Sequence, residues 1–218
     1  VTIKDIGTIG EIEYWATKIG AEIYYQELVS QFRCNGSDGY LAWLDDVLDI
    51  RETANYELED IDYDIKVVDH PQEMKKIILE RNTINNQSRI LAGYCWNWIS
   101  SGKNDTNIHD IQIDDFEISW NLGNSTTFAI DETSVNEAGC IHTAQGLEFD
   151  YVGVIIGNDM RYEDGRIVTD FTQRANTDQS LKGIKKMYKE TPEKAKEIAD
   201  EIIKNINPPP KANTETGK

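Results

Sequence analysis

CIHTAQGLEFDYVGVIIG, residues 140–157, is the stretch that decides the fold class. Its second part, YVGVIIG at 151–157, is a continuous apolar run, which is typical of a parallel strand buried on both faces. Its first part is polar and contains Gly146, which favours a tight turn because glycine tolerates backbone angles that other residues avoid. We therefore predict a polar turn that leads into a core strand of a parallel sheet.

Helical and extended patterns alternate on both sides of this stretch. Helices are predicted over 9–19, ended by Gly20, over 40–50, over 72–82 after His70-Pro71, and over 177–205 with a break at Thr191-Pro192. Strands are predicted over 21–28, 65–69, 89–98 and 125–130, and residues 131–134 are expected to form a turn into a helical cap. Strands that alternate with helices at this spacing predict an α/β protein, with a parallel sheet and helices on both faces.

The domain is expected to span residues 1–205. The range 99–124 is interpreted as a polar insertion, with a loop from Ser100 to Ile113. Residues 206–218 contain three prolines and no apolar anchor, so a disordered tail is expected there. The sequence opens on Val1 in the middle of a pattern, which suggests a piece of a longer protein.

The charge balance limits the possible partners. Asp and Glu number 39 against 22 Lys and Arg, a net charge of −17. Proteins that bind nucleic acid on their own are normally basic, because phosphate neutralisation supplies much of the affinity. We therefore expect at most weak binding of single-stranded DNA or RNA, as one surface of a larger clamp.

The apolar stretches and the cysteines indicate in which cellular compartment the protein is expected. No stretch approaches the length that spans a bilayer, and no signal-peptide pattern is present, so no membrane partner is expected. Cys34, Cys95 and Cys140 are isolated from one another and from His at ligand spacing. This pattern favours reduced thiols in a cytoplasmic protein, with no metal site.

Several side chains are candidates for ligand contacts. Thr143 and Gln145 offer a hydroxyl and an amide, and Glu148 offers a carboxylate just before the strand. A polar loop beside a parallel strand is a common ligand contact, although a tight turn before a core strand explains the same residues. Arg33 can bind phosphate in a bidentate manner or pair with a carboxylate. Trp96 and Trp98 can stack on bases or belong to the core.

Three segments resemble a known family. Residues 140–157 resemble motif V of superfamily 1 helicases, which precedes a strand of the second RecA-like domain. More narrowly, they are similar to the bacterial domain-of-unknown-function 2075 family, grouped with the Schlafen helicase-like domains. LVSQFRCNGSDGYLAWL at 28–44 resembles the motif IV region of that family, and SRILAGYCWNW at 88–98 is similar to one of its strands.

The resemblance implies a truncated second RecA-like domain of a helicase-type NTPase. It places Gln31, Arg33, Gly146 and Glu148 near the nucleotide. His142, Thr143 and Gln145 would lie near the nucleic-acid strand, with Trp96 and Trp98 able to stack on its bases.

The resemblance also implies that ATP and Mg²⁺ bind in the intact protein, against an N-terminal P-loop domain. The 218 residues contain no G-x-x-x-x-G-K-[S/T] motif, so the chain alone is expected to bind neither cofactor and to have no catalytic residue of its own.

Two other functions remain open. The chain can be a signalling or defence module whose acidic charge and polar 100–113 loop bind protein partners. A salt-dependent affinity for single strands would separate that function from the helicase-like one. A stand-alone hydrolase using Glu148 and His142 is less favoured, because no nucleophile and base stand at matching spacing.

Overall fold

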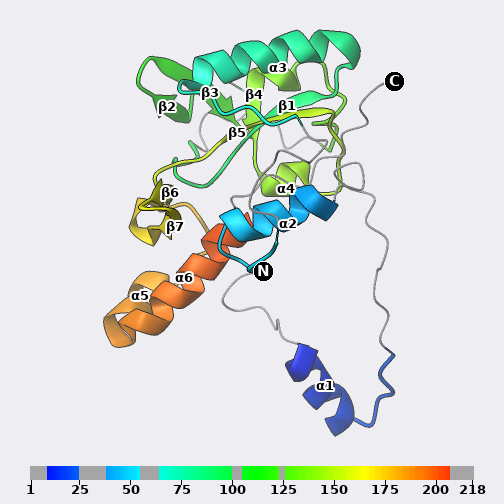
Figure 1. Cartoon of the computed structure of the whole chain (residues 1–218), viewed down its shortest axis with the longest axis vertical. Helices are drawn as coiled ribbons and strands as arrows, with labels where there is room; N and C mark the ends of the chain where they lie inside the picture. Colours follow the sequence, from blue (N-terminus) through cyan, green and yellow to red (C-terminus); the bar gives the residue numbers. More distant parts are fainter. Residues whose placement is uncertain (1–8, 25–37, 55–63, 100–104, 123–125, 207–218) are drawn as a thin grey trace.

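A mainly parallel sheet, with helices packed against it, forms the upper part of the molecule as drawn in Figure 1. The computed structural model describes residues 9–24, 38–54, 64–99, 105–122 and 126–206. The five strands lie in the order β2-β3-β4-β1-β5. Their bounds are β1 Ser88–Ala92, β2 Ile111–Ile113, β3 Phe116–Trp120, β4 Glu137–Gly139 and β5 Tyr151–Ile155. Strands β3, β4, β1 and β5 run parallel, and β2 pairs antiparallel with β3. The predicted α/β fold class is confirmed.

The two faces of this sheet are covered by different helices. Helix α3 (Pro71–Asn85) packs Ile78 on one face, over Ile90 of β1 and Ala138 of β4. On the other face, Leu91 of β1 packs with Ala144 of the short helix α4 (Ile141–Ala144) and with Phe128 and Phe149. Side chains of a strand alternate between faces, so neighbouring residues of β1 belong to different apolar clusters. Helices on both faces are thus confirmed.

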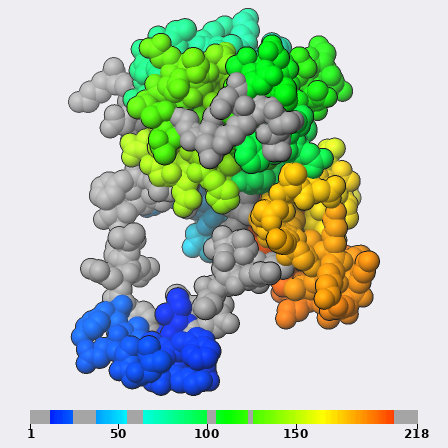
Figure 2. Space-filling view, turned by 180° about the vertical axis from the view of Figure 1, so that it is seen from behind, coloured from blue at the N-terminus to red at the C-terminus, as the bar shows by residue number. Residues whose placement is uncertain are grey.

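A further apolar cluster holds the C-terminal elements together. It joins the hairpin of β6 (Met160–Glu163) and β7 (Arg166–Thr169) to α5 (Ile184–Glu190) and α6 (Pro192–Ile206). Leu48, which follows α2 (Asp38–Val47), is buried in the same cluster. In Figure 2 the yellow and orange residues of these elements form a lobe below the green residues of the sheet. This lobe follows β5 directly in the chain, so it lies next to the ends of the sheet strands.

Some of the predicted helix starts and ends are confirmed, whereas residues 177–183 form turns before α5 instead of helix, and α2 ends at Val47 instead of continuing to residue 50. α3 begins at Pro71, and the His70 side chain caps it by accepting from the Gln72 amide at 3.2 Å. α1 (Ile9–Lys18) is followed by Gly20 at φ 71°, the left-handed conformation of a helix-ending glycine. The break at Pro192 separates α5 from α6. A 3-10 turn at Ser134–Asn136 matches the expected helical cap.

Several predicted strands are wrong. Residues 65–69 form no strand, and Val67 is 89% exposed, because a short apolar run does not itself specify burial. Within 125–130 the described residues form turns, and Phe128 is buried as a single anchor beside Leu91. The 89–98 strand ends at Ala92, where the chain turns away. Of 21–28, residues 21–24 form no strand and the rest lies outside the described residues.

The polar range 99–124 contributes to the sheet. The loop expected up to Ile113 ends in β2, and β3 follows it and pairs with β4. β3 is one of the most buried strands, with Phe116, Ile118 and Trp120 each at 2% exposure or less. Because the residues around β3 are polar, the sequence did not predict that the apolar residues of this strand belong to the core.

Candidate nucleic-acid interface

The carboxyl ends of β3, β4, β1 and β5 meet at one edge of the sheet, because these strands are parallel. The segments that leave this edge begin at Asn121, Cys140, Gly93 and Ile156. The chain passes from β1 to β3, returns to β4 and then crosses to β5 on the far side of β1. In open α/β sheets such a reversal of strand order opens a crevice for ligands at the carboxyl edge. This edge is therefore the candidate site.

Thr143 is fixed at this edge by Asn121. Its hydroxyl donates to the Asn121 side-chain oxygen at 2.6 Å, and it lies 3.4 Å from the Cys140 sulfur. Asn121 has φ 48°, and its backbone amide donates to the carbonyl of Ala138 at 2.8 Å. A left-handed residue other than glycine occurs where the surroundings hold it, often at functional sites. Asn121 was not found from the sequence, where only Thr143 was a candidate.

His142 is exposed next to a half-buried aromatic group. The ring of Tyr94 lies 6.2 Å from the ring of His142 and 5.2 Å from that of Trp120, measured between centroids. Burial raises the pKa of the Tyr94 hydroxyl, so this group is a neutral phenol at physiological pH. The imidazole of His142 thus lies beside a fixed aromatic ring and is open to solvent.

The two candidate tryptophans differ in accessibility. Trp96 is partly buried, and a Cβ placed on Gly157 would meet its ring at 3.3 Å. Trp98 is 39% exposed, and its backbone amide donates to the Thr177 hydroxyl oxygen at 3.4 Å. Because a stacking side chain must offer an open ring face, Trp98 is the better placed of the two for a base contact.

Residues 145–150 leave this edge and cross the face of the sheet. Gln145 is exposed, and Gly146 adopts φ 81° in open surroundings, where a Cβ would meet no other atom within 4 Å. At the end of the crossing the Asp150 amide donates to the carbonyl of Gln87, just before β1 begins. Glu148 is exposed and lies on this path toward the amino edge. Glu148 thus belongs to the segment that connects the carboxyl edge with the start of β5.

Gln31 and Arg33 lie outside the described residues. Their expected position near the nucleotide, together with Gly146 and Glu148, stays a prediction.

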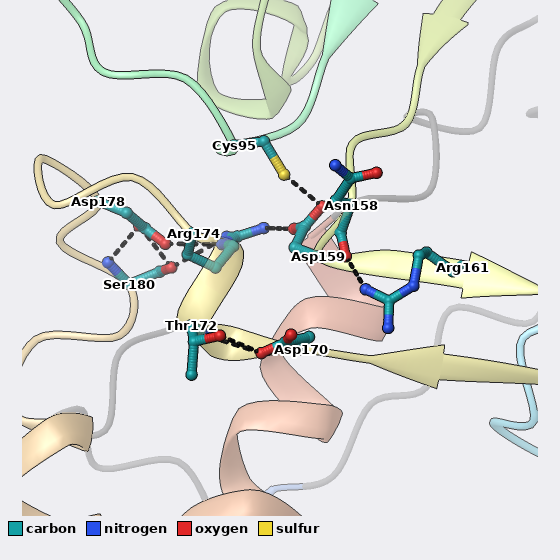
Figure 3. A network of polar contacts seen from close by, with 9 residues as sticks. All are labelled: Cys95, Asn158, Asp159, Arg161, Asp170, Thr172, Arg174, Asp178 and Ser180. Atoms are coloured by element: carbon teal, nitrogen blue, oxygen red, sulfur yellow. Dashed lines mark hydrogen bonds and ion pairs between the residues drawn. The ribbon is translucent and has the colours of Figure 1, made fainter.

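A buried ionic network supports the loop that carries the aromatic residues (Figure 3). Arg174 donates to Asp159 at 2.7 Å and to Asp178 at 2.9 Å, and all three side chains are 2% exposed or less. The Cys95 thiol donates to Asp159 at 2.7 Å. Burial, together with this hydrogen bond, raises the pKa of Cys95 to about 12. The guanidinium of Arg174 also lies 5.3 Å from the Tyr94 ring centroid.

Arg174 and Asp159 were not singled out from the sequence. They stand 15 residues apart in the chain, in a segment without a recognised motif. The signal that was available is the Asp164-Gly165 pair, a typical hairpin turn: it predicts a hairpin that begins after Asp159 and ends shortly before Arg174.

Other kinds of site find no support in the described ranges. In these ranges no cluster of three His, Cys, Asp or Glu side chains is arranged to hold a metal ion. Nor does any helix there combine the length and apolar composition needed to cross a membrane.

The parallel sheet, its two helical faces and its polar carboxyl edge define an α/β protein of the RecA-like type. The family model described as Schlafen group 3, DNA/RNA helicase domain, matches residues 1–206, and the chain belongs to this family. It is thus a helicase-like domain. No curated protein and no solved structure matches the chain.

Proposed function

We propose that this chain is the second RecA-like half of a superfamily 1 helicase-type NTPase of the bacterial domain-of-unknown-function 2075 kind, acting in the cytoplasm. It closes the nucleotide site with Gln31, Arg33, Gly146 and Glu148, and it contacts a single strand of nucleic acid at the carboxyl edge. The observation that carries the proposal is the arrangement of His142 and Thr143 at that edge, held by Tyr94 and Asn121.

The nucleotide chemistry is shared between two domains in this proposal. ATP and Mg²⁺ bind to a P-loop domain of the same protein, whose backbone amides and lysine cradle the phosphates. This chain supplies residues that complete the pocket when the two halves close. In this division Gly146 and Glu148 serve the nucleotide, and His142 and Thr143 serve the single strand.

Single-strand binding tests the nucleic-acid part. Fluorescence anisotropy with labelled single-stranded DNA and RNA is expected to give micromolar or weaker affinity at about 150 mM salt, given the net charge. His142→Asn is expected to weaken binding several-fold. The matched control is His70→Asn, which keeps a helix-capping side chain and removes an imidazole that contacts Asp115, between β2 and β3.

Three outcomes are decisive. An equal loss of single-strand affinity in the two histidine variants would contradict the assignment of the carboxyl edge as the nucleic-acid interface. Nanomolar affinity at the same salt would contradict the supporting role of this half. An absence of any binding, together with capture of a protein partner, would favour the signalling module instead.

Phosphate release tests the nucleotide part. The chain alone is expected to release phosphate from ATP at the background rate, with or without single strands, because it has no Walker A motif. ATP hydrolysis that disappears in Glu148→Ala would overturn the half-site proposal and identify a complete enzyme.

A further inference from the structure

A cavity of about 330 Å³ lies between the 3-10 turn η4 (Phe171–Gln173) and the start of α5. Its polar wall includes Arg174, Asn176, Gln179, Lys182 and Lys185. The volume is at the lower end of the roughly 300–1,000 Å³ of ligand pockets, which suits one sugar-phosphate unit rather than a larger ligand.

The charge of this wall differs in sign from that of the whole chain. Five basic residues and one acidic residue occur from Arg174 to Lys189, in a chain whose net charge is −17. The acidic residue, Asp178, accepts from Arg174 at 2.9 Å and from the Ser180 hydroxyl at 2.6 Å. Lys182 and Lys185 are exposed. Arg174 pairs with both Asp178 and Asp159, so this buried cluster carries one excess negative charge, and the positive charge at the opening of the cavity comes from Lys182 and Lys185.

Arg174 itself has a structural role and does not face the cavity opening as a free cation. It is 5% exposed and donates to two buried carboxylates. Lys182 and Lys185 are therefore the cationic side chains of this wall that can reach an anion. Lys185 donates to the Asn176 side chain at 2.9 Å, which holds its ammonium group at the rim.

The cavity is continuous with the aromatic loop of the candidate interface. The Asn176 amide donates to the Asn97 side chain at 3.1 Å, and the Ala175 amide donates to the carbonyl of Tyr94 at 2.8 Å. The Thr177 hydroxyl oxygen lies 3.4 Å from the Trp98 amide nitrogen. The lysine-lined rim therefore lies next to the loop that carries Trp98.

From this arrangement we infer that Lys182 and Lys185 bind the phosphodiester backbone of the single strand whose bases stack on Trp98. The inference rests on the proposed function and adds a specific phosphate-binding surface to it. Phosphate contact by lysine is a charge interaction without base preference, so DNA and RNA are bound alike at this wall.

Salt dependence separates these ionic contacts from stacking. Each phosphate neutralised on a single strand adds about 0.7 to the slope of log K against log salt. The double variant Lys182→Gln/Lys185→Gln is expected to lose about 1.4 of that slope between about 50 and 200 mM salt. Trp98→Ala is expected to weaken binding with the slope unchanged, since stacking releases no counterions.

The matched control is Lys194→Gln/Lys196→Gln. It makes the same change of charge on exposed positions of α6 that do not line the cavity. Thermal melting of all variants is expected to match the unaltered chain, because the four lysines are exposed. Equal slopes for the two double variants would overturn the inference while leaving the proposed function standing. No binding by the unaltered chain would overturn both.

Discussion

The Arg174 guanidinium and the Asp159 carboxylate form an ion pair of 2.7 Å in which both side chains are shielded from solvent. Asp159 directly precedes β6, and Arg174 follows η4, so the pair ties together the two ends of the segment that contains the β6–β7 hairpin (Figure 3). The same guanidinium lies against Tyr94 at the carboxyl edge. One contact therefore links the packing of the lobe to the candidate interface.

Removing the cation of this pair is expected to destabilise the fold strongly. Arg174→Met leaves Asp159 and Asp178 buried without a counter-charge, a change that typically costs about 3–5 kcal/mol. Lys66→Gln, which breaks the exposed 2.8 Å pair with Glu73, is expected to cost at most about 1 kcal/mol. Urea unfolding measures both. Similar midpoints for the two variants would mean that the buried pair is not a structural anchor.

Arg89 is expected to need its guanidinium shape. It is fully buried in β1, where it donates to the carbonyls of Phe128, Ala129 and Asp131 at 2.8–2.9 Å, and burial lowers its pKa. Lysine keeps the charge but cannot reach three carbonyls in a fork. Arg89→Lys should therefore cost about 2–4 kcal/mol, since each unsatisfied buried acceptor costs about 1–3 kcal/mol. Arg166→Lys, at an exposed position, is the control in the same urea titration.

Cys95 is expected to be an unreactive thiol. Its pKa rises from an ordinary 9.0 to about 12, so at pH 8 the reactive thiolate is on the order of a thousandfold scarcer than in the unfolded chain. Iodoacetamide labelling followed by mass spectrometry, with and without urea, measures the ratio. Comparable labelling rates in the two conditions would contradict the buried thiol–carboxylate contact.

The same shift predicts a loss of stability at high pH. Because the folded state binds this proton more tightly, the contribution of Cys95 is fully present below pH 9 and is lost as the pH rises toward 12. Cys95→Ser, whose hydroxyl does not titrate in this range, is expected to show a flatter decline between these values. Identical stability profiles against pH for the unaltered chain and Cys95→Ser would show that the Cys95 proton does not contribute to the free energy of unfolding.

Local signals predicted those elements whose ends are marked by particular residues. His70-Pro71 marks the start of α3, and Pro192 marks the start of α6. The apolar run at 151–155 predicted β5. The ends of these elements are determined by the backbone properties of a few neighbouring residues. A single sequence contains that information.

Elements that depend on distant partners could not be predicted in this way. β4 has only three residues, Glu137–Gly139, and becomes a strand because β1 and β3 lie on both sides of it. The pairing of Arg174 with Asp159 and of Asn121 with Thr143 exists only after the sheet has formed. For the candidate site, the sequence thus offered His142, Thr143, Gln145, Trp96 and Trp98 as candidates but not Asn121, which fixes Thr143.

Hydrogen exchange of backbone amides, measured with and without saturating single-stranded oligonucleotide, tests most directly whether the carboxyl edge is the nucleic-acid interface. The predicted result is slower exchange on binding in residues 94–98 and 141–146, with no change in α3, which covers a face of the sheet. Slower exchange in α3 with no change at 94–98 and 141–146 would contradict the proposed interface.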